Sequence, residues 1–216
     1  MIKINKGSEP TAWAQIKQTP GITFDSADKT ALREALLREQ VFICGYCMRR
    51  VSNKNTRIEH LKPQTISIAE NHPEETLDYR NMIICCNGDI GGNDNPKAFH
   101  CDRKKGETPI HFTPFDANAI DTLSYSSRDG EIKSSDTNYS DDINKTLNLN
   151  QPLLKANRQA KLKGVIQMLG RKSDWKKSEI KKMINAYSYK DSDGKMYEYC
   201  GIVVWFLTKR YNSARG

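Results

Sequence analysis

The sequence has no long hydrophobic run. Its longest apolar window, residues 201–207, is far shorter than the roughly 18 consecutive apolar residues of a membrane-spanning helix. The opening stretch MIKINKGSEPTAW also lacks the apolar segment of a signal peptide. Both absences argue against a membrane or secreted protein, and we expect a soluble, cytoplasmic one.

Apolar residues are modest in number, and repeats are absent. Hydrophobic residues make up 37% of the 216-residue chain, which is enough for a core of limited size. No internal repeat and no long low-complexity linker divides the chain. We therefore predict one compact core with helical additions.

Acidic residues are outnumbered by basic ones. The chain contains 34 lysines and arginines against 26 acidic residues, for a net charge of +8 and a sequence pI near 9.1. This balance favours a polyanionic partner such as nucleic acid, although an ordinary basic surface would give the same numbers.

Cysteines are scarce outside one segment. Five of the six lie between Cys44 and Cys101, and Cys200 stands alone near the C-terminus. In a reducing cytosol such a cluster indicates metal ligands or free thiols in preference to disulfides. We expect Cys200 to be a packed core thiol.

The clustered cysteines have the spacing of a zinc site. Cys44 and Cys47 form a C-x-x-C knuckle, from which two thiolates can reach one tetrahedral zinc ion. A redox pair is the alternative, but no βαβ pattern follows it. Cys86 and Cys101 can complete a four-sulfur set. Cys85 competes with Cys86, and only one of two neighbours on a strand normally faces the metal.

Periodic apolar residues predict helices at both ends of the chain. Residues 28–41 place alanines and leucines on one face. Residues 150–169 and 174–187 show similar spacing, with Pro152 tolerated in a first turn. Residues 200–211 are β-prone at their centre, so a strand is possible there, but we favour a helix.

The middle of the chain carries turn and loop signals. Residues 122–134 alternate around Asp129-Gly130, which predicts a small exposed hairpin with a two-residue turn. Residues 133–142 are polar enough to form a mobile loop.

Glu59 and His60 are adjacent and suit metal-assisted hydrolysis. A carboxylate can hold a hard divalent cation, and an imidazole can take a proton from water near neutral pH. In isolation such a dipeptide is more often an inconsequential surface pair. The surrounding motifs reverse that preference.

Three segments together resemble the HNH endonuclease family. They are RIEHLKP at 57–63, DYRNMIICC at 78–86 and HCDRKKG at 100–106, and they follow the C-x-x-C knuckle. The family pattern is C-x-x-C, then an acid and histidine with a nearby proline, then an asparagine before a cysteine, then C-N/H-x-x-K. Five elements in register over about 60 residues are far more specific than one motif.

The resemblance implies an α+β fold with a zinc-braced ββα-metal (His-Me finger) core, additional helices and a small hairpin. It makes His60 the general base, with Glu59 and Asp102 as ligands of a catalytic Mg²⁺ or Mn²⁺ ion. Asn81 would fix the loop that holds His60. The structural zinc ion would be held by Cys44, Cys47, Cys86 and Cys101.

The chain departs from the family pattern in two places. Asp102 stands where asparagine or histidine is usual, and a carboxylate coordinates Mg²⁺ at least as well. A 14-residue stretch separates Cys86 from Cys101 where many members have another C-x-x-C. His100, at the end of this stretch, is therefore an alternative ligand of zinc or magnesium.

Three basic residues follow Asp102. Lys105 is one helical turn after Asp102 and could approach a phosphate, and Arg103 and Lys104 could contact the backbone nearby. A solvated basic face is the alternative for each of them.

The same three motifs, with the later hairpin and the segments Asn148-Leu-Asn150 and Leu153-Leu154 that follow it, resemble one branch of the family in particular. This branch is the PtuB-like HNH proteins of Septu and retron-associated antiphage systems, and the resemblance covers most of residues 40–170. This resemblance implies a nuclease effector of bacterial antiphage defence with a PtuA-like ATPase partner. It also suggests an N-terminal helical segment (1–40), an HNH core (41–115) and a hairpin with a helical region packed on the core (116–216).

The expected function is hydrolysis of nucleic-acid phosphodiester bonds, with DNA favoured over RNA. The rival from another class is a catalytically inactive, zinc-containing adaptor that binds nucleic acid, and a redox or metallochaperone protein is a more distant alternative. The region after about residue 145 either binds a partner or completes the core.

Overall fold

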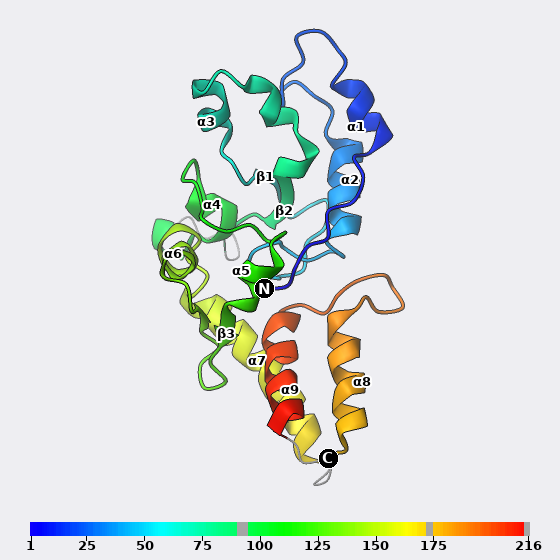
Figure 1. The fold of residues 1–216 in the computed structure, drawn as a ribbon, viewed down its shortest axis with the longest axis vertical. Coiled ribbons are helices and arrows are strands. Elements are labelled where there is room, and N and C mark those ends of the chain that lie inside the picture. The colour runs from blue at the N-terminus through cyan, green and yellow to red at the C-terminus, as the bar shows by residue number, and fades with distance from the viewer. Residues whose placement is uncertain (90–94, 172–174, 214–216) are drawn as a thin grey trace.

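The computed structural model describes residues 1–89, 95–171 and 175–213 (Figure 1). The described part is a mixed α+β structure, mostly helical, with two antiparallel two-stranded sheets. The α+β prediction is confirmed at this level. Among the described residues, no helix combines the length and apolarity needed to cross a bilayer.

The helices and strands follow one another along the chain with short connections. The α-helices are α1 (Thr11–Ile16), α2 (Thr30–Glu39), α3 (Gln64–Ala69), α4 (Cys101–Lys105), α5 (Ala117–Asp121), α6 (Thr137–Asp141), α7 (Pro152–Gly170), α8 (Lys177–Ser188) and α9 (Cys200–Ser213). The strands are β1 (Thr56–His60), β2 (Met82–Cys86), β3 (Leu123–Tyr125) and β4 (Ile132–Ser134). Shorter turns of helix cover Pro73–Leu77, Tyr79–Asn81, Pro96–Ala98 and Asp142–Thr146.

The helices predicted from apolar periodicity are present as α2, α7, α8 and α9. Pro152 occupies the first turn of α7, as expected, and the Gln151 side chain accepts a hydrogen bond from the Leu153 amide. The β-prone segment at 200–211 is a helix because Ile202, Val203 and Leu207 are buried when helical spacing places them on one side.

The predicted hairpin exists, but its turn and its exposure differ from the prediction. Six residues, 126–131, join β3 to β4, and the Ser126 amide donates to the Glu131 carbonyl. Tyr125 and Ile132 are buried, and the Arg158 guanidinium of α7 donates to the Gly130 carbonyl at 2.6 Å. The hairpin is therefore packed on the helical region, so the two-residue turn and the exposed position were both wrong.

The mobile loop predicted at 133–142 is also wrong. This segment contains the end of β4 and the helix α6. The Asp136 carboxylate accepts a hydrogen bond from the Tyr139 amide at 3.0 Å and caps α6. Its polar residues are thus capping groups, which composition alone does not distinguish from loop residues.

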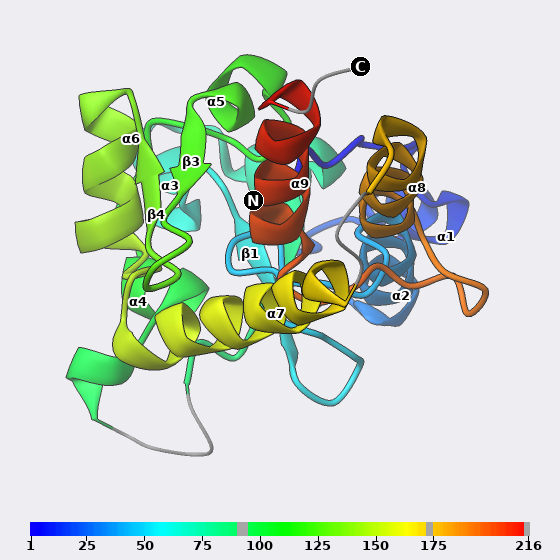
Figure 2. The same cartoon turned by 90° about the horizontal axis from the view of Figure 1, so that it is seen from below.

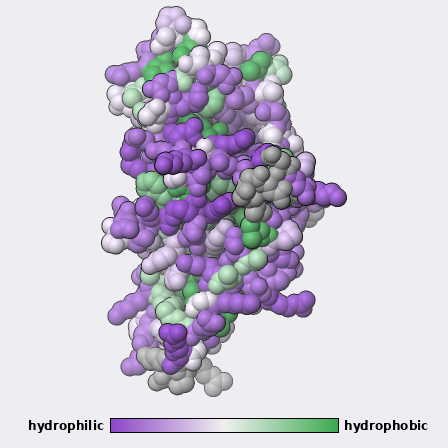
Figure 3. Space-filling view, turned by 180° about the vertical axis from the view of Figure 1, so that it is seen from behind, coloured by the Kyte–Doolittle hydropathy of each residue, from purple (hydrophilic) through white to green (hydrophobic). Residues whose placement is uncertain are grey.

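The β1–β2 sheet lies in the middle of the molecule. In Figure 1, α1 and α3 lie towards one end and α7, α8 and α9 towards the other, with β1, β2 and α4 between them. Figure 2 shows α7 crossing this second end beneath α9. The face seen in Figure 3 is largely hydrophilic, with small scattered hydrophobic areas.

Helix α2 is fixed against β2 by one buried glutamine. The Gln40 amide nitrogen donates to the Ile84 carbonyl at 2.8 Å, and its oxygen accepts from the Ile84 amide at 2.6 Å. Gln40 therefore continues the hydrogen bonding of the strand where a third strand would lie. This contact places the segment that follows α2 directly beside β2.

Candidate functional site

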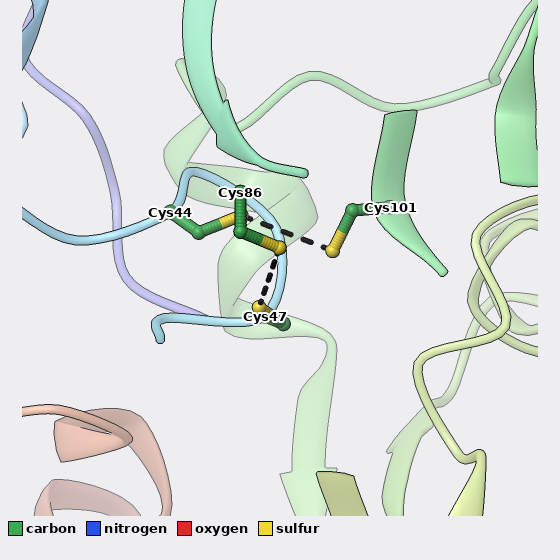
Figure 4. A group of neighbouring side chains, drawn as sticks. All are labelled: Cys44, Cys47, Cys86 and Cys101. Atoms are coloured by element: carbon green, nitrogen blue, oxygen red, sulfur yellow. Dashed lines mark hydrogen bonds between the residues drawn. The ribbon is translucent and has the colours of Figure 1, made fainter. Parts of the chain in front are cut away.

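Four buried cysteines converge on one point. The sulfur atoms of Cys44, Cys47, Cys86 and Cys101 all lie within 4.8 Å of one another (Figure 4). The Cys44 and Cys101 sulfurs are 3.8 Å apart, and those of Cys47 and Cys86 are 3.7 Å apart. With Zn–S bonds of about 2.3 Å, two ligands of a tetrahedral zinc ion are separated by roughly 3.8 Å. The cluster therefore fits a structural Zn²⁺ ion, with the four ligands predicted.

The local chain explains how the first two thiols reach the cluster. The Gly45 amide donates to the Ile84 carbonyl at 2.9 Å, which holds the knuckle against β2. A Cβ atom at Gly45 would lie 2.9 Å from the Ile83 side chain. Met48 turns the chain away with a φ of 62°. A larger residue at position 45 would therefore require the end of the Ile83 side chain to shift.

The structure also distinguishes between the neighbouring candidates for the fourth position. Cys86 belongs to the cluster and Cys85 does not. Burial raises the pKa of the Cys85 thiol. The His100 imidazole lies beside the cluster, with its Nε2 atom 3.7 Å from the Cys86 sulfur. His100 is therefore a neighbour of a sulfur ligand and is not one of the four converging residues.

A cavity of about 230 Å³ lies next to the cluster, between β1 and α4. Glu59 and His60 of β1 and Asp102 of α4 all line it. Asp102 directly follows the cluster residue Cys101, and Cys86 pairs with Thr56 at the other end of β1. The cluster thus fixes the two elements that carry these side chains.

Glu59 is a buried carboxylate with two polar partners. Its Oε1 atom accepts a hydrogen bond from the Tyr46 hydroxyl at 3.0 Å and lies 2.9 Å from the Lys105 ammonium group. Burial raises the pKa of Glu59, and hydrogen-bonding contact with the Asp102 carboxyl group raises that pKa further. The Asp102 carboxylate lies 3.8 Å from the Arg57 guanidinium. Carboxylate oxygens are the ligands that hard divalent cations prefer, and such a cation would offset the cost of placing two carboxyl groups side by side. Glu59 and Asp102 therefore fit a hard divalent ion.

The position of the Lys105 side chain differs from the prediction, which placed it where it could approach a phosphate. This side chain is only 1% exposed, and besides pairing with Glu59 it donates to the His60 carbonyl oxygen at 3.1 Å. Burying an ammonium group is costly unless a charged partner is present, and the Glu59 carboxylate is that partner. Lys105 therefore points inward, towards Glu59. Arg103 and Lys104 lie further out. The Arg103 guanidinium pairs with Asp89 at 3.0 Å, and Lys104 is exposed.

The His60 ring is held in one orientation. Its Nε2 atom lies 2.9 Å from the Thr76 carbonyl oxygen. The Phe24 ring packs edge-on against it, with the two ring centres 4.5 Å apart. A carbonyl oxygen only accepts hydrogen bonds, so Nε2 carries the proton and Nδ1 keeps a lone pair. Burial lowers the pKa of His60. The ring is therefore neutral at pH 7 and able to accept a proton.

Asn81 ties the loop after His60 to the start of β2. Its side-chain nitrogen donates to the Lys62 carbonyl at 2.9 Å, and its side-chain oxygen accepts from the Lys62 amide at 2.8 Å. Its backbone carbonyl accepts from the Leu61 amide. These contacts have the geometry expected of a residue that fixes the His60 loop.

Replacing Asn81 with alanine is expected to lower the free energy of unfolding by about 1–3 kcal/mol, because the backbone amide and the backbone carbonyl of Lys62 both lose their hydrogen-bond partner. Denaturant unfolding followed by circular dichroism measures this change. Asn118→Ala is the matched control, because that side chain is exposed. Its expected change is within about 0.5 kcal/mol. Equal stability of the two variants would contradict the role given to Asn81.

Sequence reasoning missed two residues of the site. The Tyr46 hydroxyl reaches Glu59 only because Tyr46 lies between two cluster cysteines. The Phe24 ring packs on His60 from a turn far away along the chain. The position of Tyr46 inside the knuckle was an available signal, whereas nothing local marked Phe24.

Comparisons with known proteins add no relative: no family model matches the chain, and no curated protein matches it. Its function is therefore inferred from the site. A buried four-thiol cluster beside a cavity with two carboxyl groups and a neutral imidazole suits metal-assisted hydrolysis.

Proposed function

We propose that this protein is a metal-dependent HNH endonuclease that hydrolyses phosphodiester bonds of nucleic acid. The supporting observation is the meeting of Glu59, His60 and Asp102 in one cavity beside the four-cysteine cluster. This arrangement is an antiparallel strand pair followed by a short helix, with Glu59 and His60 on β1 and Asp102 on α4.

The chemistry follows from the side chains. The Nδ1 atom of His60 accepts a proton from a water molecule, and the water oxygen forms a new bond to phosphorus while the bond from phosphorus to the 3′ oxygen breaks. Glu59 and Asp102 would hold Mg²⁺ or Mn²⁺, whose positive charge, when it is bound, stabilises the charge developing on the phosphate and the leaving oxygen.

The remaining contacts position these groups. Tyr46 and Lys105 hold the Glu59 carboxyl group from the side of the knuckle and of α4. Thr76 and Phe24 orient the His60 ring, and Asn81 fixes the loop that follows it. Structural Zn²⁺ in the cysteine cluster would keep β1 and α4 at this separation.

We further propose that the enzyme is the nuclease effector of a bacterial antiphage system and works with a PtuA-like ATPase. Support for this role comes from the sequence motifs at 57–63, 78–86 and 100–106, together with the later hairpin and the segments Asn148-Leu-Asn150 and Leu153-Leu154. Such a partner would deliver the nuclease to its target or restrain it.

The test is cleavage of supercoiled plasmid DNA and of total RNA by the purified zinc-loaded protein. Cleavage is expected with added Mg²⁺ or Mn²⁺ and not without it. Each reaction is repeated with the candidate ATPase partner. Binding of nucleic acid without cleavage under all of these conditions would favour the inactive adaptor instead.

A further inference from the structure

The positive charge of this protein is concentrated in its C-terminal helical region. Residues 152–216 contain 15 lysines and arginines against 5 acidic residues, whereas residues 1–151 contain 19 against 21. In the described part of this region, Lys155 is the one basic side chain paired with a carboxylate. The excess charge therefore belongs to the region of the sequence that contains α7, α8 and α9 and not to the proposed catalytic core.

One part of this region combines a lysine with two tyrosines. The Lys161 ammonium group of α7 lies 4.9 Å from the centre of the Tyr197 ring and 5.6 Å from that of Tyr187. The two rings are 4.8 Å apart, and Tyr197 is 38% exposed. Surfaces that bind single-stranded nucleic acid use this combination, in which the cation attracts phosphate and an exposed ring stacks on an unpaired base.

One hollow and two side-chain contacts connect this cluster with the catalytic cavity. Lys161 and Arg49 line one hollow of about 370 Å³. The Arg49 guanidinium donates to the Asp89 carbonyl at 3.1 Å, and the Asp89 carboxylate pairs with Arg103. Arg103 lines the catalytic cavity.

The acidic groups along this path are already engaged. The Asp89 carboxylate pairs with Arg103. Glu198, which also lines the hollow, accepts a hydrogen bond from the Arg50 amide at 2.6 Å. The ion pair with Arg103 reduces the repulsion that Asp89 would offer to a phosphate backbone.

We propose that Arg103, Arg49, Lys161, Tyr187 and Tyr197, together called the basic strip, bind an unpaired strand of the nucleic-acid substrate and lead it to the cavity. This inference rests on the proposed function for its substrate class. It assigns the C-terminal helical region to substrate binding and gives preference to single-stranded over fully paired nucleic acid.

The test measures binding separately from cleavage. The zinc-loaded 216-residue protein carrying His60→Ala is titrated, without added Mg²⁺, into a fluorescein-labelled 20-nucleotide DNA strand, an RNA strand of the same sequence and the corresponding DNA duplex. Fluorescence anisotropy is the readout. Lys161→Glu and Tyr197→Leu are introduced singly. Lys209→Glu is the matched control, because it makes the same charge change on α9 but lines a separate hollow with Tyr125.

The expected result is that Tyr197→Leu weakens single-strand binding by about 5- to 100-fold. Lys161→Glu should also weaken it, and Lys161→Gln should reduce the slope of log affinity against log salt concentration by about 0.7. Lys209→Glu should bind nearly as the parent does. Circular dichroism spectra matching the parent exclude misfolding.

Equal weakening by all variants, or by none, would overturn the proposal, and so would stronger binding to the duplex than to the strands. The two measurements distinguish failure of the nuclease proposal from failure of the basic-strip proposal. A protein that binds strands through the basic strip but never cleaves them contradicts only the nuclease proposal. A protein that cleaves while the strip variants bind and cleave normally contradicts only the strip.

Discussion

Replacing Cys101 with serine is expected to abolish zinc binding and to unfold much of the protein. A structural zinc site contributes on the order of 10 kcal/mol in small zinc-dependent folds, comparable with the whole stability of a typical domain. The substitution barely changes the size of the side chain, so the loss comes from the missing thiolate and not from packing. Zinc content by mass spectrometry and thermal unfolding by circular dichroism provide the two measurements.

Cys200→Ala is the matched control for this prediction. Cys200 is also fully buried, but it lies in α9 away from the cluster. Its loss should leave zinc bound and cost about 1 kcal/mol, because only a small apolar contact disappears. If Cys101→Ser kept one equivalent of zinc and the parent's melting temperature, the four-cysteine site would have to be abandoned.

Replacing His60 with alanine is expected to lower the rate of nucleic-acid cleavage by about 10²- to 10⁴-fold, since the proton acceptor for the attacking water is removed. The zinc cluster does not include His60, so zinc content should equal that of the parent. Initial rates of plasmid nicking in Mg²⁺ measure the effect, and zinc content is determined on the same samples.

His72→Ala controls for the loss of any imidazole. The His72 side chain is 57% exposed, pairs with Glu74 and does not line the catalytic cavity. Its removal should leave the cleavage rate within twofold of the parent, as expected for a surface substitution without catalytic contacts. Comparable rates for the His60 and His72 variants would place the general base elsewhere.

The sequence predicted those parts of the structure that depend on local spacing. Apolar periodicity located α2, α7, α8 and α9, because a helix repeats its buried face over a few residues. The choice of Cys86 over Cys85 needed only the rule that strand neighbours face opposite ways, and the structure confirms it.

Features that depend on distant contacts were not predictable in this way. Lys105 was expected near solvent because its helical spacing matches that of Asp102, but the contact with Glu59 turns it inward. The hairpin at 123–134 was expected to be exposed because nothing local indicates that Arg158 would bond to its turn. The mechanistic roles of His60, Asn81 and Asp102 stay predictions, for which the structure supplies compatible geometry.

The separation of the cysteines along the chain has a consequence for biosynthesis. Cys44 and Cys101 are 57 residues apart, and Asp102 follows the second of them. A ribosome must therefore have released both strands of the sheet and α4 before four thiolates can surround one ion. Until then β1 and α4 are not held together, and the proposed nuclease has no complete cavity. If the proposed function holds, a cell would thus produce the nuclease in an inert form, and its first activity would depend on the local supply of zinc.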